Sequence, residues 1–342
     1  MLSSGTPTAP APPTATMSPR PSRIVRDLAG LTAVAVAGIA GFYLFPNDLG
    51  LLTRMVSAAF LVVSLDLLVG YAGVATLGQA AMFGLGAYAA ANTNLAGVQE
   101  PLVMVLIGGL AGALGGLVSG AIVLRAHGLP RLVLTIAVVQ LAHEAANKLS
   151  AWTGGSDGLS GLEPGPVLGL FRFDLYGRTG FLFSLVLLVI TLAVLVRLTR
   201  SPFGLKVRAI GRDPGRVRTM GGAVLPTLLV VYTIAGLVAG MGGALEAIAA
   251  GVVGLDAISF ERSATALVML VLGGAGSLFG AVLGTVVFMG FEHIVSASNP
   301  FHWLIVVGVM LVAVVLFLPR GLGSAAAELQ RLARIAGLGG AR

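Results

Sequence analysis

Long apolar stretches without a single charged residue are the feature that most restricts how this chain can fold. Thr179–Val196 and Ala223–Leu245 contain no Asp, Glu, Lys or Arg. Over the whole chain 56% of the residues are hydrophobic and 10% are charged, whereas charged residues make up about 25% of a typical soluble domain. Because a soluble fold has no interior large enough for this apolar surface, the sequence predicts an all-α, polytopic membrane protein.

Candidate membrane spans run along most of the chain. The first, Leu28–Phe45, has 18 uncharged residues, and at a rise of about 1.5 Å per residue it is long enough to cross a bilayer core. The further candidates are Leu51–Gly70, Ala72–Gly97, Leu102–Leu124, Leu132–Leu149, Thr179–Val196, Ala223–Ala250, Ser263–Phe291 and Trp303–Leu318. We therefore expect about 8–10 membrane helices.

The basic residues predict which loops face the cytoplasm. Between the two uncharged stretches lie seven basic residues and one acidic residue: Arg197, Arg200, Lys206, Arg208, Arg212, Asp213, Arg216 and Arg218. The positive-inside rule places this loop, residues 197–222, in the cytoplasm. Arginines also precede the first span and follow the last one, so both termini are expected on the same side.

The remaining segments complete the expected organisation. Residues 1–22 are rich in Pro, Thr, Ser and Ala and predict a disordered cytoplasmic tail. Residues 23–322 form the membrane domain, with an external loop at 150–178, and residues 323–342 form a second cytoplasmic tail. Nine simple crossings would put the termini on opposite sides. We therefore expect one span to be re-entrant or broken, and Ser263–Phe291 is favoured because glycines occupy its middle.

Two glycine-rich segments share one pattern. Gly70–Gly78 and Gly273–Gly280 each contain Gly-x-Ala-Gly, followed by a small polar residue, Leu and another Gly. Apolar segments interrupted by glycine in both halves of a chain indicate a substrate path, while close helix packing is the alternative. The residues expected to line a translocation path are Gly73, Thr76, Gln79, Gly274, Gly276 and Ser277.

Other chemistries have little support in the sequence. Charged or titratable residues within the apolar runs are few, namely Asp66, His143, Glu144, Glu246, Glu292 and His293, and their spacing is not that of a zinc site. We expect no metal, cofactor or nucleic acid. There is no phosphate-binding Gly-x-x-x-x-Gly-Lys-Ser/Thr motif, so ATP hydrolysis is not expected in this chain. An ion-coupled transporter using Asp66 or Glu246 stays open, as does an intramembrane hydrolase using Ser156.

Several motifs resemble those of a known family. Leu67–Tyr88 is similar to the first conserved block of branched-chain amino-acid ABC transporter permeases, in particular the subunit with the longer chain. Four further segments agree with that family in order and spacing: Trp152–Leu159, Arg208–Gly221, Leu272–Gly280 and Leu318–Leu322. The resemblance covers roughly Arg54–Leu322, which is nearly the whole chain outside the tails.

This resemblance implies a permease subunit of an ABC importer in a bacterial inner membrane, without catalytic residues of its own. The solute would be a branched-chain amino acid or a related small polar compound. The implied partners are a second permease, two cytoplasmic ATP-binding subunits and an external solute-binding protein. The basic loop would couple to the ATPase through Arg208, Arg212, Asp213, Arg216, Arg218 and Gly221. The external loop would receive the binding protein.

The chain departs from the family pattern at several positions. Gln79 stands where the family commonly has His, and Asp66 where it commonly has Asn. A basic tract, Arg216–Thr219, replaces the usual acidic one in the coupling segment. Relatives carry urea, amides and aromatic acids as well as amino acids, so the resemblance leaves the solute open.

Overall fold

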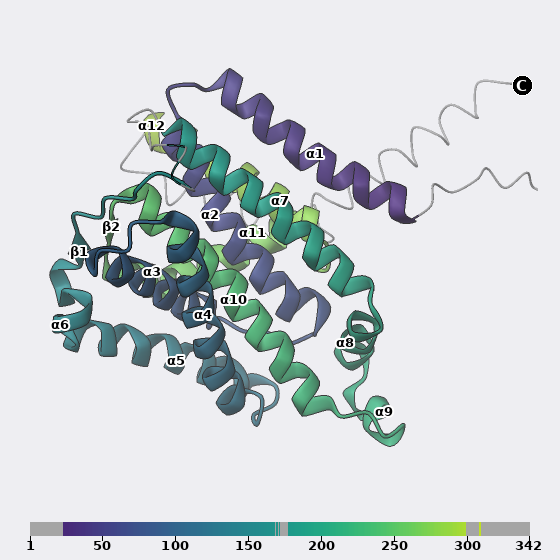
Figure 1. Cartoon of the computed structure of the whole chain (residues 1–342). Coiled ribbons are helices and arrows are strands. Elements are labelled where there is room, and N and C mark those ends of the chain that lie inside the picture. The colour runs from purple at the N-terminus through teal and green to yellow at the C-terminus, as the bar shows by residue number, and fades with distance from the viewer. Residues whose placement is uncertain (1–22, 168, 170, 172–176, 299–307, 309–342) are drawn as a thin grey trace, which may run out of the picture.

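The computed structural model describes residues 23–167, 169, 171, 177–298 and 308. Nearly all of its regular structure is helical (Figure 1). Within these residues seven helices are long and apolar enough to cross a membrane: Asp27–Leu44, Leu49–Tyr71, Pro101–Val123, Leu129–Lys148, Arg178–Arg200, Val224–Ala250 and Leu278–Ser296. The prediction of an all-α, polytopic membrane protein is confirmed.

The helices and strands follow one another with short connections. In chain order they are α1 (Arg23–Leu44), α2 (Leu49–Asp66), the π-helix η1 (Leu67–Tyr71), α3 (Gln79–Leu95), α4 (Pro101–Val123), α5 (Leu129–Lys148), α6 (Ser150–Thr153), the 3₁₀-helix η2 (Gly155–Asp157), β1 (Leu159–Ser160), α7 (Arg178–Arg200), α8 (Pro202–Arg212), α9 (Pro214–Thr219), α10 (Val224–Ala250), β2 (Val252–Val253), the 3₁₀-helix η3 (Leu255–Ile258), α11 (Phe260–Gly273) and α12 (Leu278–Ser298).

Helix α10 is the centre of the bundle and packs against α2, α3 and α4. Its contact with α4 is made by glycines on both helices, which we call the glycine seam: Gly108, Gly112 and Gly116 on α4, and Gly236 and Gly240 on α10. A Cβ atom added at Gly112 would overlap the carbonyl oxygen of Gly236, and one at Gly240 would overlap that of Gly108. The two backbones therefore touch directly, as small residues allow in membrane helices.

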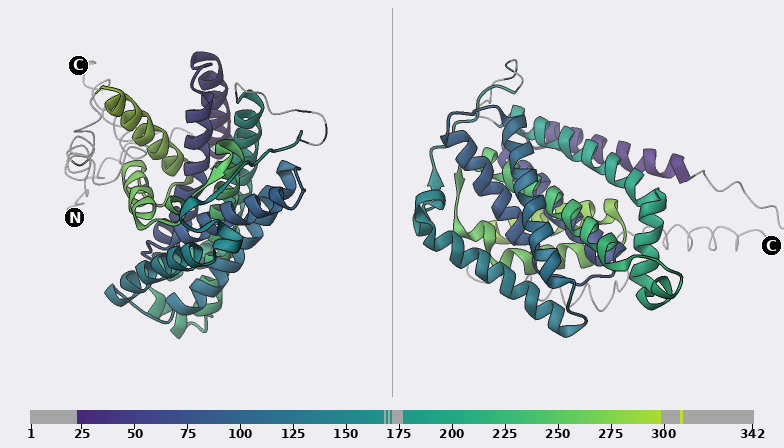
Figure 2. Two further views of the ribbon diagram at one scale, coloured as in Figure 1. Left: turned by 90° about the vertical axis from the view of Figure 1, so that its left-hand side faces the viewer. Right: turned by 60° about the horizontal axis from the view of Figure 1, so that its bottom comes forward.

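Helix α1 lies at the edge of the bundle, alongside α7 (Figure 2). The ring of Phe42 stacks on that of Phe181, with 6.3 Å between the ring centroids. At the other end of α1, Asp27 forms an ion pair with Arg200, the last residue of α7. The start of α1 is thus on the same side of the bundle as the start of the basic segment.

The two ends of the bundle carry different structures (Figure 1). Helices α8 and α9 lie at one end, which we call the coupling end. Helix α6 and the strands β1 and β2 lie at the other, which we call the loop end. Strand β1 pairs antiparallel with β2, with Leu159 opposite Val253, so the segment after α5 is joined to the segment after α10.

The expected break in Ser263–Phe291 is confirmed. Helix α11 ends at Gly273 and α12 begins at Leu278, and Gly274 and Gly276 have positive φ angles of 94° and 87°. Helix α11 has 14 residues and is not among the seven candidate spans, whereas α12 supplies one of them.

One expected span differs from the structure. Ala72–Gly97 is not helical throughout, because α3 begins only at Gln79 and the preceding residues from Ala72 form a loop with a positive φ of 66° at Gly73. The tails 1–22 and 323–342, the span Trp303–Leu318 and the segment Leu318–Leu322 lie outside the described residues, apart from Gly308. The side of the C-terminus therefore stays a prediction.

Candidate functional site

The two glycine-rich segments interrupt their helices in the same way. We call residues 70–79 the first block and residues 273–280 the second block. In each of them the last glycine of Gly-x-Ala-Gly adopts a positive φ, 66° at Gly73 and 87° at Gly276. This backbone conformation favours glycine because side chains with a Cβ rarely adopt it. The shared sequence pattern thus produces the same local break twice.

The two blocks are in direct contact. The carboxylate oxygen Oδ1 of Asp66 accepts a hydrogen bond from the backbone N–H of Gly276, over 2.6 Å. A Cβ atom at Gly70 would overlap both Asp66 Oδ1 and the Gly276 nitrogen. The contact is made at the end of α2 by Asp66, Gly70 and Gly276. Of these three, only Gly276 is among the residues predicted to line the path. Asp66 lies four positions before Gly70 in an apolar run, and this spacing could have indicated a contact at the end of α2.

The first block is surrounded by several other elements. Gly73 lies against α8, where an added Cβ would be 2.8 Å from the carbonyl oxygen of Gly211. The hydroxyl of Thr76 is 2.9 Å from the Tyr232 hydroxyl on α10, and Thr135 on α5 accepts a hydrogen bond from the backbone N–H of Leu77 over 3.1 Å. Gly73 and Thr76 therefore face α8 and α10, and the structure does not bring them onto the second block.

The polar side chains of the two blocks differ in their partners. Ser277 accepts a hydrogen bond of 3.1 Å from the Gly280 N–H and so caps the start of α12. Gln79 is the first residue of α3 and is buried. Its Oε1 is 3.5 Å from the Ser64 hydroxyl, and its Nε2 has no hydrogen-bond partner among the described residues. Gln79 is thus the one predicted path residue with an unused buried donor in the described part of the chain.

The predicted coupling segment consists of two short helices at the coupling end. Val207 and Ile210 on α8 are buried, and the basic side chains of Lys206, Arg208, Arg212, Arg216 and Arg218 are exposed. Asp213 accepts a hydrogen bond of 2.9 Å from the Arg216 N–H and caps α9. Gly221 has a φ of 78° just after α9 ends. Asp213 and Gly221 therefore shape the segment, and the basic side chains form its surface.

The coupling segment touches the first block at two points. The guanidinium carbon of Arg208 lies 4.8 Å from the centroid of the Tyr71 ring, a cation–π distance. One turn further along α8, Gly211 meets Gly73 backbone to backbone. Any displacement of α8 therefore acts directly on residues 71–73.

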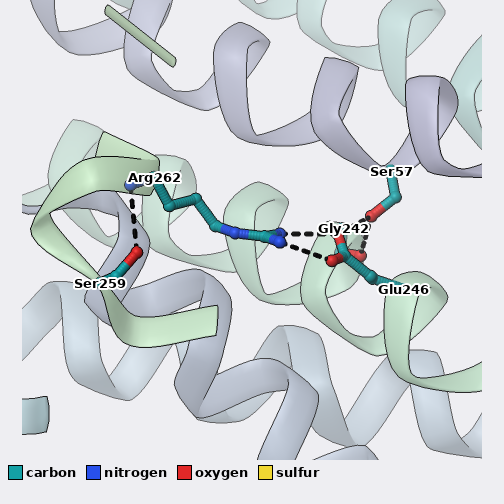
Figure 3. Close-up of polar contacts among 5 residues, drawn as sticks. All are labelled: Ser57, Gly242, Glu246, Ser259 and Arg262. Carbon is teal, nitrogen blue, oxygen red and sulfur yellow. Dashed lines mark hydrogen bonds and ion pairs between the residues drawn. The ribbon is translucent and has the colours of Figure 1, made fainter. Parts of the chain in front are cut away.

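A charged pair joins α10 to α11 (Figure 3). Arg262 donates two hydrogen bonds of 2.7 Å to the carboxylate of Glu246. Ser57 on α2 donates to the Gly242 carbonyl over 2.8 Å and lies 3.2 Å from Glu246 Oε2. The Ser259 hydroxyl accepts from the Arg262 N–H over 3.1 Å. Glu246 is thus neutralised by Arg262, a partner that sequence reasoning missed because it lies one position outside the apolar run.

Neither carboxylate considered for ion coupling is free of protein contacts, since Asp66 is bonded to Gly276 and Glu246 to Arg262. Ser156 is exposed in η2, with its hydroxyl 3.3 Å from Asp157 Oδ1. Across the described residues, no group of three or more His, Asp or Glu side chains is arranged to hold a metal ion.

Comparison with known proteins agrees with a transport role. Residues 48–315 match the family described as "Branched-chain amino acid transport system / permease component". The chain belongs to this family. The match begins after α1, and it includes both blocks, the coupling segment and the β1–β2 pair.

Individual relatives include the high-affinity branched-chain amino acid transport system permease protein LivM of Salmonella typhimurium and of Escherichia coli. This permease is 27% identical to each of them over 314 residues, which cover 85% of its chain and 74% of LivM. It is also 27% identical to the galactose/methyl galactoside import permease protein MglC of Salmonella typhimurium over 230 residues, 63% of its chain and 66% of MglC. No solved structure matches it.

These matches confirm the predicted family. The permease is a non-catalytic, multi-pass membrane subunit of an ABC importer. Membership of this family rules against the two alternatives, an ion-coupled transporter and an intramembrane hydrolase.

Proposed function

We propose that this permease imports branched-chain amino acids or chemically related small polar solutes. It does so with a second permease, two cytoplasmic ATP-binding subunits and an external solute-binding protein, in a bacterial inner membrane. The similarity to LivM over 85% of the chain supports an amino-acid solute. The similarity to the sugar permease MglC covers a smaller share, 63% of the chain, and is the reason for including other polar solutes.

The observation that carries this proposal is the contact between the coupling segment and the first block. The exposed basic residues of α8 and α9 are suited to bind acidic side chains of an ATP-binding subunit. When the ATP-binding subunits close, α8 moves, and the contacts of Arg208 with Tyr71 and of Gly211 with Gly73 transmit this movement. The contact between Gly70 and Gly276 then passes it to the second block.

The solute path follows the two blocks. Glycines permit a backbone to leave the helix beside a cavity. Thr76, Gln79 and Ser277 bring hydrogen-bonding groups to this region. Gly73, Gly274 and Gly276 supply the breaks. In this proposal the blocks separate and close in turn, so the path opens first to the outside and then to the cytoplasm.

The coupling end is the cytoplasmic one. The positive-inside rule supports this orientation, and the ion pair of Asp27 with Arg200 supports a cytoplasmic N-terminus. The loop end then faces outward. Its exposed residues Trp152, Ser156 and Asp157 offer a surface for the solute-binding protein.

Charge reversal in the coupling segment tests the proposed coupling. Arg212 and Arg216 are exposed, so the double variant Arg212→Glu/Arg216→Glu should insert and fold normally. Like charges brought together at an interface cost several kcal/mol, so leucine uptake should fall at least about tenfold while ATP hydrolysis continues. Arg125→Glu, an exposed basic residue outside α8 and α9, is the control. Normal uptake by the double variant at normal expression would refute a docking role.

Thiol labelling tests the orientation. The chain has no cysteine, so Ser156→Cys introduces a unique thiol in the exposed turn of η2. We expect an impermeant maleimide to label it from outside intact cells, and labelling to decrease when the loaded binding protein is added. If the thiol is labelled only after the cytoplasmic side is made accessible, the loop end faces the cytoplasm and the proposed orientation is wrong.

A further inference from the structure

A polar cavity that the proposed path does not use lies between α2 and the α11–α12 hairpin. Its volume is about 440 Å³, within the range of about 300–1,000 Å³ that is common for small-molecule sites. Charged side chains from five elements line it: Arg54, Glu246, Asp256, Glu261, Arg262 and Glu292. All of them lie toward the loop end of their helices.

The charges of this cavity are of both signs. Glu246 and Arg262 are paired with each other, as Figure 3 shows. Arg54, on α2, and Glu292, on α12, form no ion pair with another residue of the described ranges. Ionisable side chains within membrane helices face water-filled spaces rather than lipid, because their burial in hydrocarbon is costly. The cavity is therefore hydrated, with a cation and carboxylates available to a solute.

The deeper wall of the cavity is apolar. Leu61 and Val62 on α2 and Met269 on α11 line it, and all three are buried. Leu61 is seven residues beyond Arg54, a distance of about 10 Å along the helix axis. The cavity therefore offers one ligand both a charged rim and an apolar wall.

We propose that this cavity is a receiving site for a zwitterionic amino acid with an aliphatic side chain. Arg54 binds the carboxylate of the amino acid. Glu292 binds its ammonium group, together with Asp256 and Glu261. The aliphatic side chain of the amino acid packs on Leu61 and Met269. This site rests on the proposed function as an amino-acid importer. It gives the permease its own selection for the solute after release from the binding protein.

The contact between Asp66 and Gly276 lies beyond this site on the way to the cytoplasm. Asp66 is twelve residues after Arg54, about 18 Å further along α2. The same hairpin that lines the cavity is held to α2 there by the Gly276 N–H. A bound amino acid stays on the outer side until this contact opens.

Binding to the four-chain importer in nanodiscs, without the binding protein, tests the site. The probes are leucine, isopentylamine, which lacks the carboxylate, and 4-methylpentanoate, which lacks the ammonium group. Wild type should bind leucine at least about tenfold more tightly than either analogue, since each loses one charged hydrogen-bonding group. Arg54→Gln should weaken leucine binding about tenfold and leave isopentylamine unchanged. Glu292→Gln should weaken leucine equally and leave 4-methylpentanoate unchanged.

The controls separate this site from the proposed function. Lys148→Gln removes an exposed charge at the loop end outside the cavity and should change nothing. If wild-type importer takes up leucine with its binding protein but neither variant alters binding, the receiving site is refuted and the proposed function stands. Loss of the second permease from purified Arg54→Gln importer, with leucine binding retained, would make the cavity a subunit interface and also refute the site. A wild-type importer that takes up no leucine refutes the amino-acid function itself.

Discussion

The two glycine-rich blocks have the same break in very different surroundings. The first block is held by α5, α8 and α10, through Leu77, Gly73 and Thr76. The second block forms the tip of a hairpin, where an added Cβ at Gly276 would meet only the Gly70 oxygen, at 3.6 Å, and the Gly276 N–H is bonded to Asp66. One sequence pattern thus produces a firmly packed turn in one half of the chain and a lightly attached tip in the other. We infer that the first block transmits force and the second block moves.

The largest effect on stability should come from adding a methyl group at Gly73. Its φ of 66° and the Gly211 oxygen, 2.8 Å from the added Cβ, both oppose Gly73→Ala. We expect a loss of at least about 2 kcal/mol in unfolding free energy, seen as a lower melting temperature and lower monodisperse yield. Gly97→Ala is the matched control, because Gly97 has a φ of 95° and no atom within 4 Å of its added Cβ. Equal losses in the two variants would mean that contact with α8 contributes nothing.

The same change in the second block should affect transport more than folding. An added Cβ at Gly276 meets its nearest neighbour, the Gly70 oxygen, at 3.6 Å, so Gly276→Ala carries only the strain of its positive φ. Its melting temperature should match that of Gly97→Ala, and its leucine uptake should fall by more than about tenfold because the tip is distorted. If Gly276→Ala destabilises the protein as much as Gly73→Ala, the contrast between the blocks is wrong.

A smaller effect is expected from the side chain that holds the tip. Asp66→Leu leaves the Gly276 N–H without its acceptor, which costs about 1–3 kcal/mol locally. Asp66→Asn keeps an acceptor oxygen and should preserve both yield and uptake. We expect uptake by Asp66→Leu to fall about tenfold. Equal uptake by the two variants, measured at equal membrane yield, would show that this hydrogen bond has no part in transport.

The smallest effects should come from the hydroxyl groups. Thr76→Val removes the contact with Tyr232, and Ser277→Ala removes the cap of α12. Each should lower the unfolding free energy by about 1 kcal/mol. Thermal unfolding of the purified variants measures this. Only Thr76→Val should also slow uptake, because Thr76 belongs to the first block, which contacts the coupling segment through Tyr71 and Gly73. A larger transport defect in Ser277→Ala would place the critical hydroxyl in the second block.

The sequence predicts the bounds of a helix well where a long uncharged run defines the helix. The uncharged runs in α4, α7 and α10 predict their bounds to within a few residues, and the glycines at 273–276 predict the break between α11 and α12. The late start of α3 is missed, because Ala72–Gly78 is as apolar and small as the helix that follows. The amino-acid composition of this stretch does not reveal that Gly73 has a positive φ angle, which keeps the residues before Gln79 out of the helix.

Contacts between distant segments are the part that sequence cannot supply. The Glu246–Arg262 pair, the Asp66–Gly276 hydrogen bond and the β1–β2 pairing all join residues from different elements. Their partners are fixed by how the helices pack, and no local pattern encodes that packing. The cavity beside Arg54 is missed for the same reason, since its charged residues come from five separate elements.

The glycine seam between α4 and α10 limits how this sequence can diverge. A methyl group at Gly112 or Gly240 would overlap the backbone of the opposite helix, which no rotation of side chains relieves. The apolar windows of α1 and α5 are 0% and 17% buried, and most of their side chains meet no such obstacle. Mutations should therefore accumulate in lineages of this transporter along α1 and α5, while the seam keeps its glycines. Populations under mutagenesis would reveal the seam as a row of positions at which no substitution survives.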